Sequence, residues 1–190
     1  MTRRKKLKIT EDSVETRYAN WTAQMLAIMM PWSLYWVAGR ASAKTVPPMM
    51  TEEELEVQEA AQDCPGAPFA WVADTYSDLH KNVIPSLIDG LQLLGWELGT
   101  HYVINEAPPE EWRLRMYNVC TDWRNTMVFF TGFNFTFISL DRLAIGAGRS
   151  YVGVFGDEVK YFPEEKFTNL LKAVRGFYVK YGQSVWYPEH

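Results

Sequence analysis

The stretch from Trp36 to Thr45 combines residue types that suit phosphate binding. An apolar run comes first, small residues follow from Ala38 to Ala43, and Lys44 stands beside Thr45. The backbone N–H groups of a tight loop can surround phosphate oxygens, a lysine adds positive charge for the β- and γ-phosphates, and a hydroxyl can hold Mg²⁺. The order predicts a buried strand over 34–37, a phosphate-binding loop, and a helix whose positive end faces the phosphates.

This stretch departs from the standard phosphate-loop pattern G-x-x-x-x-G-K-[ST], because alanine stands at both glycine places, Ala38 and Ala43. A strand followed by an exposed turn that happens to contain Arg40 and Lys44 is the other interpretation. The stretch alone leaves both open.

A second stretch, from Tyr151 to Glu158, carries matching chemistry. It is a short apolar run rich in β-formers that ends in two adjacent carboxylates. Beside a phosphate loop, Asp157 would hold the Mg²⁺ shell, and Glu158 would orient and deprotonate a water molecule. A solvated acidic turn is the plain alternative. Taken together, the two stretches favour a nucleotide hydrolase, since both lie at predicted strand ends with enough chain between them for several βα units.

Composition fits one globular domain. The chain has 190 residues, of which 47% are hydrophobic and 15% aromatic, enough for a sizeable core. The whole chain has a net charge of −4, but five of its 19 basic residues lie between Arg3 and Lys8, which leaves 14 basic against 23 acidic residues in the rest. A basic tail therefore precedes an acidic body. We expect residues 1–10 to be a flexible tail, either solubilising or in contact with nucleic acid, and residues 11–190 to be the domain.

The cysteine usage fits a reducing cytoplasm, and the apolar N-terminal stretch does not have the features of a membrane span or a signal peptide. Cys64 and Cys120 have no metal-ligand spacing and suggest no disulfide framework. The run from Trp21 to Ala38 is apolar enough to consider a membrane span or a signal peptide, but Pro31 and Ser33 divide it and an acidic leader precedes it. We therefore expect no membrane segment.

Around and between the two motifs, strand and helix patterns alternate. The patterns predict these elements: a helix over 10–30, an acidic helix over 50–62, a strand over 69–73, a helix over 77–94 with a kink or restart at Pro85, a short strand over 102–105, a strand pair over 126–131 and 135–139 around a hairpin-like turn, a strand ending at 157, a helix over 163–181 and a strand from 184. This alternation predicts an α/β fold with a mostly parallel central sheet, and together with the two nucleotide motifs it indicates a P-loop NTPase-like three-layer sandwich.

At this point the sequence resembles a known family, the ATPase domain of tailed-phage terminase large subunits. The resemblance spans about residues 31–176 and is carried by three segments: Gly39–Thr45, Ala70–Leu87 with Gly90 shortly after it, and Ala147–Tyr151 leading to Phe155–Glu158. The family implies an ATP-driven motor that packages double-stranded DNA into procapsids. Such motors work as a homo-oligomeric ring on the portal protein, with a small terminase subunit, in the cytoplasm of the bacterial host.

The resemblance also implies roles for single residues. It makes ATP and Mg²⁺ the cofactors, with Lys44 on the phosphates and Glu158 activating the attacking water. Arg40 matches an arginine inside the family's deviant loop, where it would sense or stabilise charge near the γ-phosphate. Arg142 and Arg149 are further candidates for an arginine finger. The implied ligands are these: Gly39, Arg40, Ala41, Ser42, Ala43, Lys44 and Thr45 for the nucleotide, and Thr45 and Asp157 for the metal.

The chain departs from the family in stopping one strand after the acidic pair. The family would continue with a Ser/Thr-type coupling motif, the rest of the ATPase core and a nuclease domain. We therefore expect a fragment whose sandwich is incomplete at its C-terminal end and whose hydrolysis by itself is weak or absent. Two other functions stay open: another P-loop ATPase of helicase or remodeller type, and a nucleotide-binding assembly module without turnover.

Overall fold

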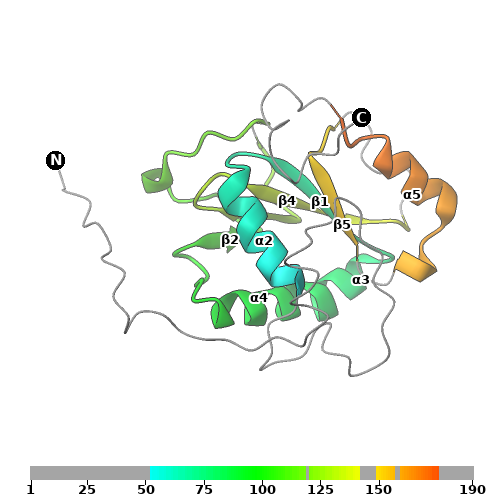
Figure 1. Ribbon diagram of the computed structural model, residues 1–190, viewed down its shortest axis with the longest axis horizontal. Helices are drawn as coiled ribbons and strands as arrows, with labels where there is room; N and C mark the ends of the chain where they lie inside the picture. Colours follow the sequence, from blue (N-terminus) through cyan, green and yellow to red (C-terminus); the bar gives the residue numbers. More distant parts are fainter. Residues whose placement is uncertain (1–51, 119, 142–148, 157–158, 176–190) are drawn as a thin grey trace.

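A computed structural model describes residues 52–118, 120–141, 149–156 and 159–175 (Figure 1). The helix expected over 10–30, the strand over 34–37, the phosphate loop and the strand from 184 lie outside these residues. The predictions for them are therefore untested.

The centre of the fold is a five-stranded sheet of order β2-β3-β4-β1-β5 (Figure 1). Its strands are β1 (Pro68–Ala73), β2 (Tyr102–Ile104), β3 (Thr126–Phe129), β4 (Asn134–Ser139) and β5 (Gly153–Gly156). β1 runs parallel to both β4 and β5, whereas β3 runs antiparallel to β2 and to β4. The α/β class is confirmed, but the sheet is mixed, so the prediction of a mostly parallel sheet holds only for its β4-β1-β5 part.

The antiparallel part follows from a short connection. Only residues 130–133 join β3 to β4, and a parallel pair needs a crossover of a dozen or more residues. Gly132 lies in this turn with φ +85°, a conformation that glycine adopts without steric cost. The predicted hairpin-like strand pair is thus confirmed.

β1 is the strand on which the sheet is built. Each of its six residues is buried, as expected for a strand with neighbours on both sides and helices on both faces. Its side chains alternate between the faces: Phe69, Trp71 and Ala73 belong to one core cluster, and Ala70 and Val72 to the other. The predicted strand over 69–73 is confirmed.

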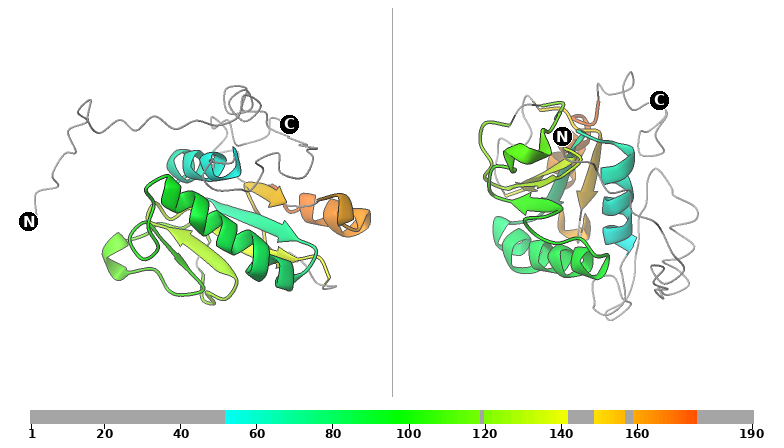
Figure 2. Two further views of the ribbon diagram at one scale, coloured as in Figure 1. Left: turned by 90° about the horizontal axis from the view of Figure 1, so that it is seen from below. Right: turned by 90° about the vertical axis from the view of Figure 1, so that its left-hand side faces the viewer.

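Helices α2 (Glu52–Asp63) and α4 (Ile84–Leu93) cover the first face. α2 contributes Val57, Ala60 and Ala61, each fully buried, to the same cluster as Trp71. Its sequence reads as a solvated acidic helix because its buried side chains are mostly small, yet one face packs in the core. Figure 2 shows α2 and α4 beside each other over the sheet.

The helix predicted over 77–94 forms as three joined pieces. A short α3 (Tyr76–Asp78) leads into a wide π-helical turn, η2 (Leu79–Val83), and then into α4. The wide turn comes directly before Pro85, whose ring lacks an N–H and clashes with the carbonyl of a regular helix. Ile84 accordingly donates to the carbonyl of Leu79, five residues earlier. The predicted irregularity at Pro85 is confirmed.

The second face is covered by α5 (Glu164–Leu171), so helices lie on both sides of the sheet (Figure 2). Leu170 and Ala173 are buried against Val72 and Tyr151. The helix was predicted to run past residue 175 with Leu171 inward. Instead it ends at Leu171, which is 44% exposed, and Val174 forms a bridge with Tyr151. Two 3-10 turns complete the described elements, η3 (Glu110–Trp112) and η4 (Val159–Tyr161).

Candidate functional site

Three parallel strands end at one edge of the sheet. Ala73 of β1 pairs with Ser139 of β4, and Val72 pairs with Gly156 of β5. The last residues of these strands therefore lie side by side. In open α/β sheets, ligands bind in the crevice beyond the carboxyl ends of the strands. This edge, which we call the carboxyl edge, is the candidate site.

Hydrogen bonds tie the loops after β1 and β4 together at the carboxyl edge. The Ser139 hydroxyl lies 3.1 Å from the backbone carbonyl of Asp74 and also bonds to the Asp141 carboxylate. The backbone N–H groups of Leu140 and Asp141 donate to the carbonyls of Ala73 and Asp74, each over 3.1 Å. Ser139 is only 1% exposed, and its hydroxyl is held by internal hydrogen bonds. The hydroxyl therefore has a structural role and is not a free nucleophile.

Two more side chains hold the elements that leave this edge. Thr75 caps α3, because its hydroxyl oxygen accepts from the Asp78 N–H over 3.1 Å and its O–H donates to the Asp78 carboxylate over 2.6 Å. On the other face, the Lys166 ammonium group of α5 donates to the carbonyl of Leu140 over 2.6 Å. The loop after β1 is therefore bonded to α3, and the loop after β4 is bonded to α5.

β5, which ends at the same edge, begins and ends with a glycine, and neighbouring side chains lie close to both. A Cβ on Gly153 would lie 2.4 Å from a ring carbon of Phe69. A Cβ on Gly156 would lie 3.1 Å from Val159 and 3.3 Å from the ring of Phe162. The contact at Gly153 is the tighter of the two, and it fixes the start of β5 close to the Phe69 ring.

The sequence-predicted site residues are mostly outside the described residues. This holds for the loop Gly39–Thr45 with Arg40, Lys44 and Thr45, for the acidic pair Asp157 and Glu158, and for Arg142. What the structure adds is the position of the residue directly before the acidic pair, Gly156, at the carboxyl edge. Within the described residues, no group of three or more His, Cys, Asp or Glu side chains could hold a metal ion.

Arg149 is described, and it lies toward the opposite end of the sheet. Its guanidinium donates to the Thr136 hydroxyl over 3.2 Å. Thr136 pairs with Ala70 and comes three residues, about 10 Å along the strand, before the end of β4. Arg149 therefore does not reach the carboxyl edge of its own chain.

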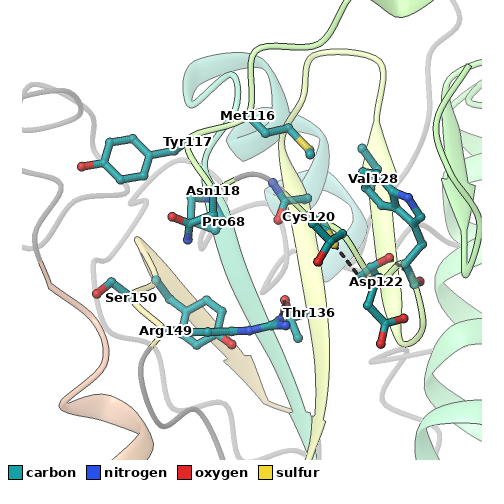
Figure 3. A pocket seen from close by; sticks show the side chains of 15 residues that line it. Pro68, Met116, Tyr117, Asn118, Cys120, Asp122, Val128, Thr136, Arg149 and Ser150 are labelled. Atoms are coloured by element: carbon teal, nitrogen blue, oxygen red, sulfur yellow. Dashed lines mark hydrogen bonds between the residues drawn. The ribbon is translucent and has the colours of Figure 1, made fainter. Parts of the chain in front are cut away.

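A pocket of about 490 Å³ opens beside Arg149 near the amino ends of β1 and β4 (Figure 3). Its lining includes Pro68, Asp122, Thr136 and Tyr151. Burial raises the pKa of the Tyr151 hydroxyl above its ordinary value, while Arg149 and Thr136 act in the opposite direction. Sequence reasoning missed this pocket, because it is assembled from the loop before β3, from β4 and from the segment before β5. Arg149 was the one pocket residue that the sequence analysis singled out, and there it was a candidate arginine finger.

The side chains His80 and Lys81, expected at the surface, are exposed. Cys64 is buried and Cys120 half-buried, and no disulfide joins them. None of the helices in the described part of the chain is long and apolar enough to cross a membrane.

Comparisons with known proteins give no relative on which to base a function. No protein-family model matches the chain, no curated protein matches it, and no solved structure matches it.

Proposed function

We propose that this chain is a Mg²⁺-dependent ATP-binding and hydrolysing domain with a P-loop NTPase-like fold, similar to the motor domain of phage terminase large subunits. One observation carries the proposal. The acidic pair Asp157-Glu158 follows directly on Gly156, where β5 ends beside β1 at the carboxyl edge. Two carboxylates at the carboxyl end of a parallel strand are what ATP hydrolysis on such a sheet requires.

The sheet leaves room for the strand that would carry the phosphate loop. Among the described strands, β5 pairs only with β1. The segment 173–175 bonds to Tyr151, directly before β5, so on this side of the sheet only the outer edge of 153–156 is without a strand partner among the described residues. The strand expected over 34–37 is one candidate. Placed there, Lys44 and Thr45 would lie at the same edge as Asp157, as phosphate binding requires.

The sequence-based roles of the single residues carry over to this proposal. Backbone N–H groups of Gly39–Ala43 and the Lys44 ammonium group would bind the phosphates, and Arg40 would approach the γ-phosphate. Glu158 would accept a proton from the attacking water and hold that water in line. Mg²⁺, when bound, neutralises phosphate charge.

The donor set suits this metal. Mg²⁺ in nucleotide-dependent enzymes keeps several waters and takes one or two protein side chains together with phosphate oxygens. Thr45 and Asp157 supply one hydroxyl and one carboxylate. A nucleotide-bound Mg²⁺ therefore does not need a cluster of three protein ligands, and the described residues hold none.

A role in DNA packaging would imply these partners: double-stranded DNA, a portal protein, a small terminase subunit and further copies of the motor in a ring. The position of Arg149 bears on the arginine finger. If Arg149 has that role, it acts on the nucleotide of a neighbouring subunit, because it lies away from the carboxyl edge of its own. Arg40 is the candidate within the same chain.

Phosphate release from ATP, measured with and without double-stranded DNA, tests the proposal. Glu158→Gln should abolish turnover and leave ATP binding intact, because the amide cannot take the proton of the water. Binding without release in the parent chain would favour the assembly module, and DNA-stimulated strand separation would favour a helicase. Measurable turnover in the parent chain that is equally fast in Glu158→Gln would contradict the assigned role of Glu158.

A further inference from the structure

The pocket beside Arg149 lies apart from the carboxyl edge. Pro68, at the first position of β1, lines it, whereas the candidate ATP site lies beyond Ala73 at the other end of that strand. Five residue steps of extended chain cover about 17 Å. A ligand in this pocket would therefore occupy a second site.

Hydrogen-bond donors converge on one side of the pocket. Figure 3 shows the Arg149 side chain extended toward Thr136, with Ser150 on the same side. The Thr136 hydroxyl oxygen accepts from Arg149 over 3.2 Å, and both groups lie close enough to the Tyr151 hydroxyl to oppose the rise in its pKa that burial causes. The guanidinium has other N–H groups to donate, and among the described residues it forms no ion pair with a carboxylate.

Tyr151 adds a buried hydroxyl to this side. The residue is only 1% exposed, and its hydroxyl lies beside the side chains of Arg149 and Thr136, which oppose the rise in its pKa, without a hydrogen bond of standard geometry in the described part of the chain. Buried polar groups are nearly always paired, since an unpaired one forfeits its bonds to water. At a pocket wall, this hydroxyl can bond to a ligand without giving up a hydrogen bond of standard geometry inside the protein.

The charge around the pocket favours an anion. The only carboxylate among the lining residues is Asp122, and it is neutralised by Arg124 through an ion pair of 2.6 Å and two more hydrogen bonds from the same guanidinium. Arg149 is the remaining charged side chain of the lining. Its positive charge is therefore in excess.

We propose that this pocket binds an organic phosphate, with the phosphoryl group on Arg149 and the hydroxyls of Thr136 and Tyr151. Donors that approach from several directions suit a tetrahedral group with three terminal oxygens better than a planar carboxylate with two. The opposite wall holds apolar side chains, among them Met116 and Val128, against which the organic part packs (Figure 3). The volume of about 490 Å³ is in the range of small-molecule sites.

Chemical-shift titration of the full chain with phenyl phosphate tests this proposal. The titration uses a Lys44→Ala background, so that the proposed ATP site contributes nothing. Saturable shifts are expected at Arg149, Thr136 and Tyr151, and inorganic phosphate should shift the same residues more weakly. Arg149→Gln should weaken binding about tenfold or more, and Tyr151→Phe about two- to tenfold. Arg113→Gln, which removes an exposed arginine outside the pocket, should have no effect.

Three results would overturn the proposal. The first is no saturable shift at about 10 mM probe, well above the millimolar affinity expected for a few polar contacts. The second is an equal loss in Arg149→Gln and Arg113→Gln, which would indicate general charge attraction. The third is an identical response to phenol, which would show that the phosphoryl group is not recognised. None of these results depends on whether the carboxyl edge binds ATP.

Discussion

Adding one methyl group at Gly153 should loosen β5, the strand that ends just before the acidic pair. A Cβ there would lie 2.4 Å from one ring carbon of Phe69 and 2.9 Å from the next, well inside contact distance. Gly153 is not among the glycines with positive φ, so Gly153→Ala adds no backbone strain and its cost comes from this overlap alone.

The Phe69 ring has little freedom to move away. It is 2% exposed and packs against Phe133, Phe135 and Phe155, with ring centroids 4.9, 6.2 and 5.9 Å away. Overpacking of a tight core costs about 1–3 kcal/mol, and a ring held on several sides belongs at the upper end. We expect Gly153→Ala to lower the free energy of unfolding by about 2–3 kcal/mol and the melting temperature by about 5–10 °C.

A double-mutant cycle measured by urea denaturation isolates the overlap. Phe69→Leu removes the ring edge that the new methyl group would strike, so Gly153→Ala should cost at least about 1 kcal/mol less in that background. Gly99→Ala is the matched control. Gly99 has φ +83° and no atom within 4 Å of a built Cβ, so it should cost about 1 kcal/mol from its backbone conformation and show no coupling to Phe69. Additive effects of Gly153→Ala and Phe69→Leu would refute the reasoning.

Three further changes test the ties around the sheet. Lys166→Met removes a half-buried ammonium group that donates over 2.6 Å to the first carbonyl after β4, and should cost about 1–2 kcal/mol in urea unfolding, while Lys172→Met, at an exposed site, should cost under about 0.5. Thr75→Ala removes the α3 cap and should cost about 1 kcal/mol, whereas Thr75→Ser should restore most of it. Hydrogen bonds from Arg124 lower the pKa of Asp122 to about 2, so Arg124→Gln should return it toward 3.8 in a carboxyl NMR titration. Because the folded-state pKa is lowered, the stabilisation by this pair is present above about pH 4 and is lost as the pH falls toward 2; an unchanged Asp122 midpoint in Arg124→Gln would contradict this.

The local elements were largely predictable from periodicity. The apolar run at Phe69, the hairpin around Gly132 and the irregular helix at Pro85 each have a cause within a few residues of chain. The mixed sheet was predictable only in part. The hairpin required an antiparallel pair, but the position of β4 beside β1 rests on packing between distant segments, on which local patterns carry no information.

Tertiary packing also decides the two main differences. α2 reads as a solvated acidic helix, since its buried face consists largely of alanines, and only the facing aromatic side chains of the sheet make that face part of the core. The helix after Pro163 stops early because residues near Val174 pair with Tyr151. The pocket around Arg149 was unpredictable for the same reason, because segments far apart in the sequence form it.

Calorimetry of Mg-ATP binding to the full chain, beside Lys44→Ala, tests the central proposal most directly. Charge-assisted hydrogen bonds contribute about 1.5–3 kcal/mol each, so losing two phosphate contacts should weaken binding at least about a hundredfold. We expect the parent chain to bind and Lys44→Ala to lose binding while keeping its folded spectrum. A folded parent chain that does not bind Mg-ATP would contradict an ATP site at the carboxyl edge. Equal affinities of the parent chain and Lys44→Ala for Mg-ATP would contradict it as well.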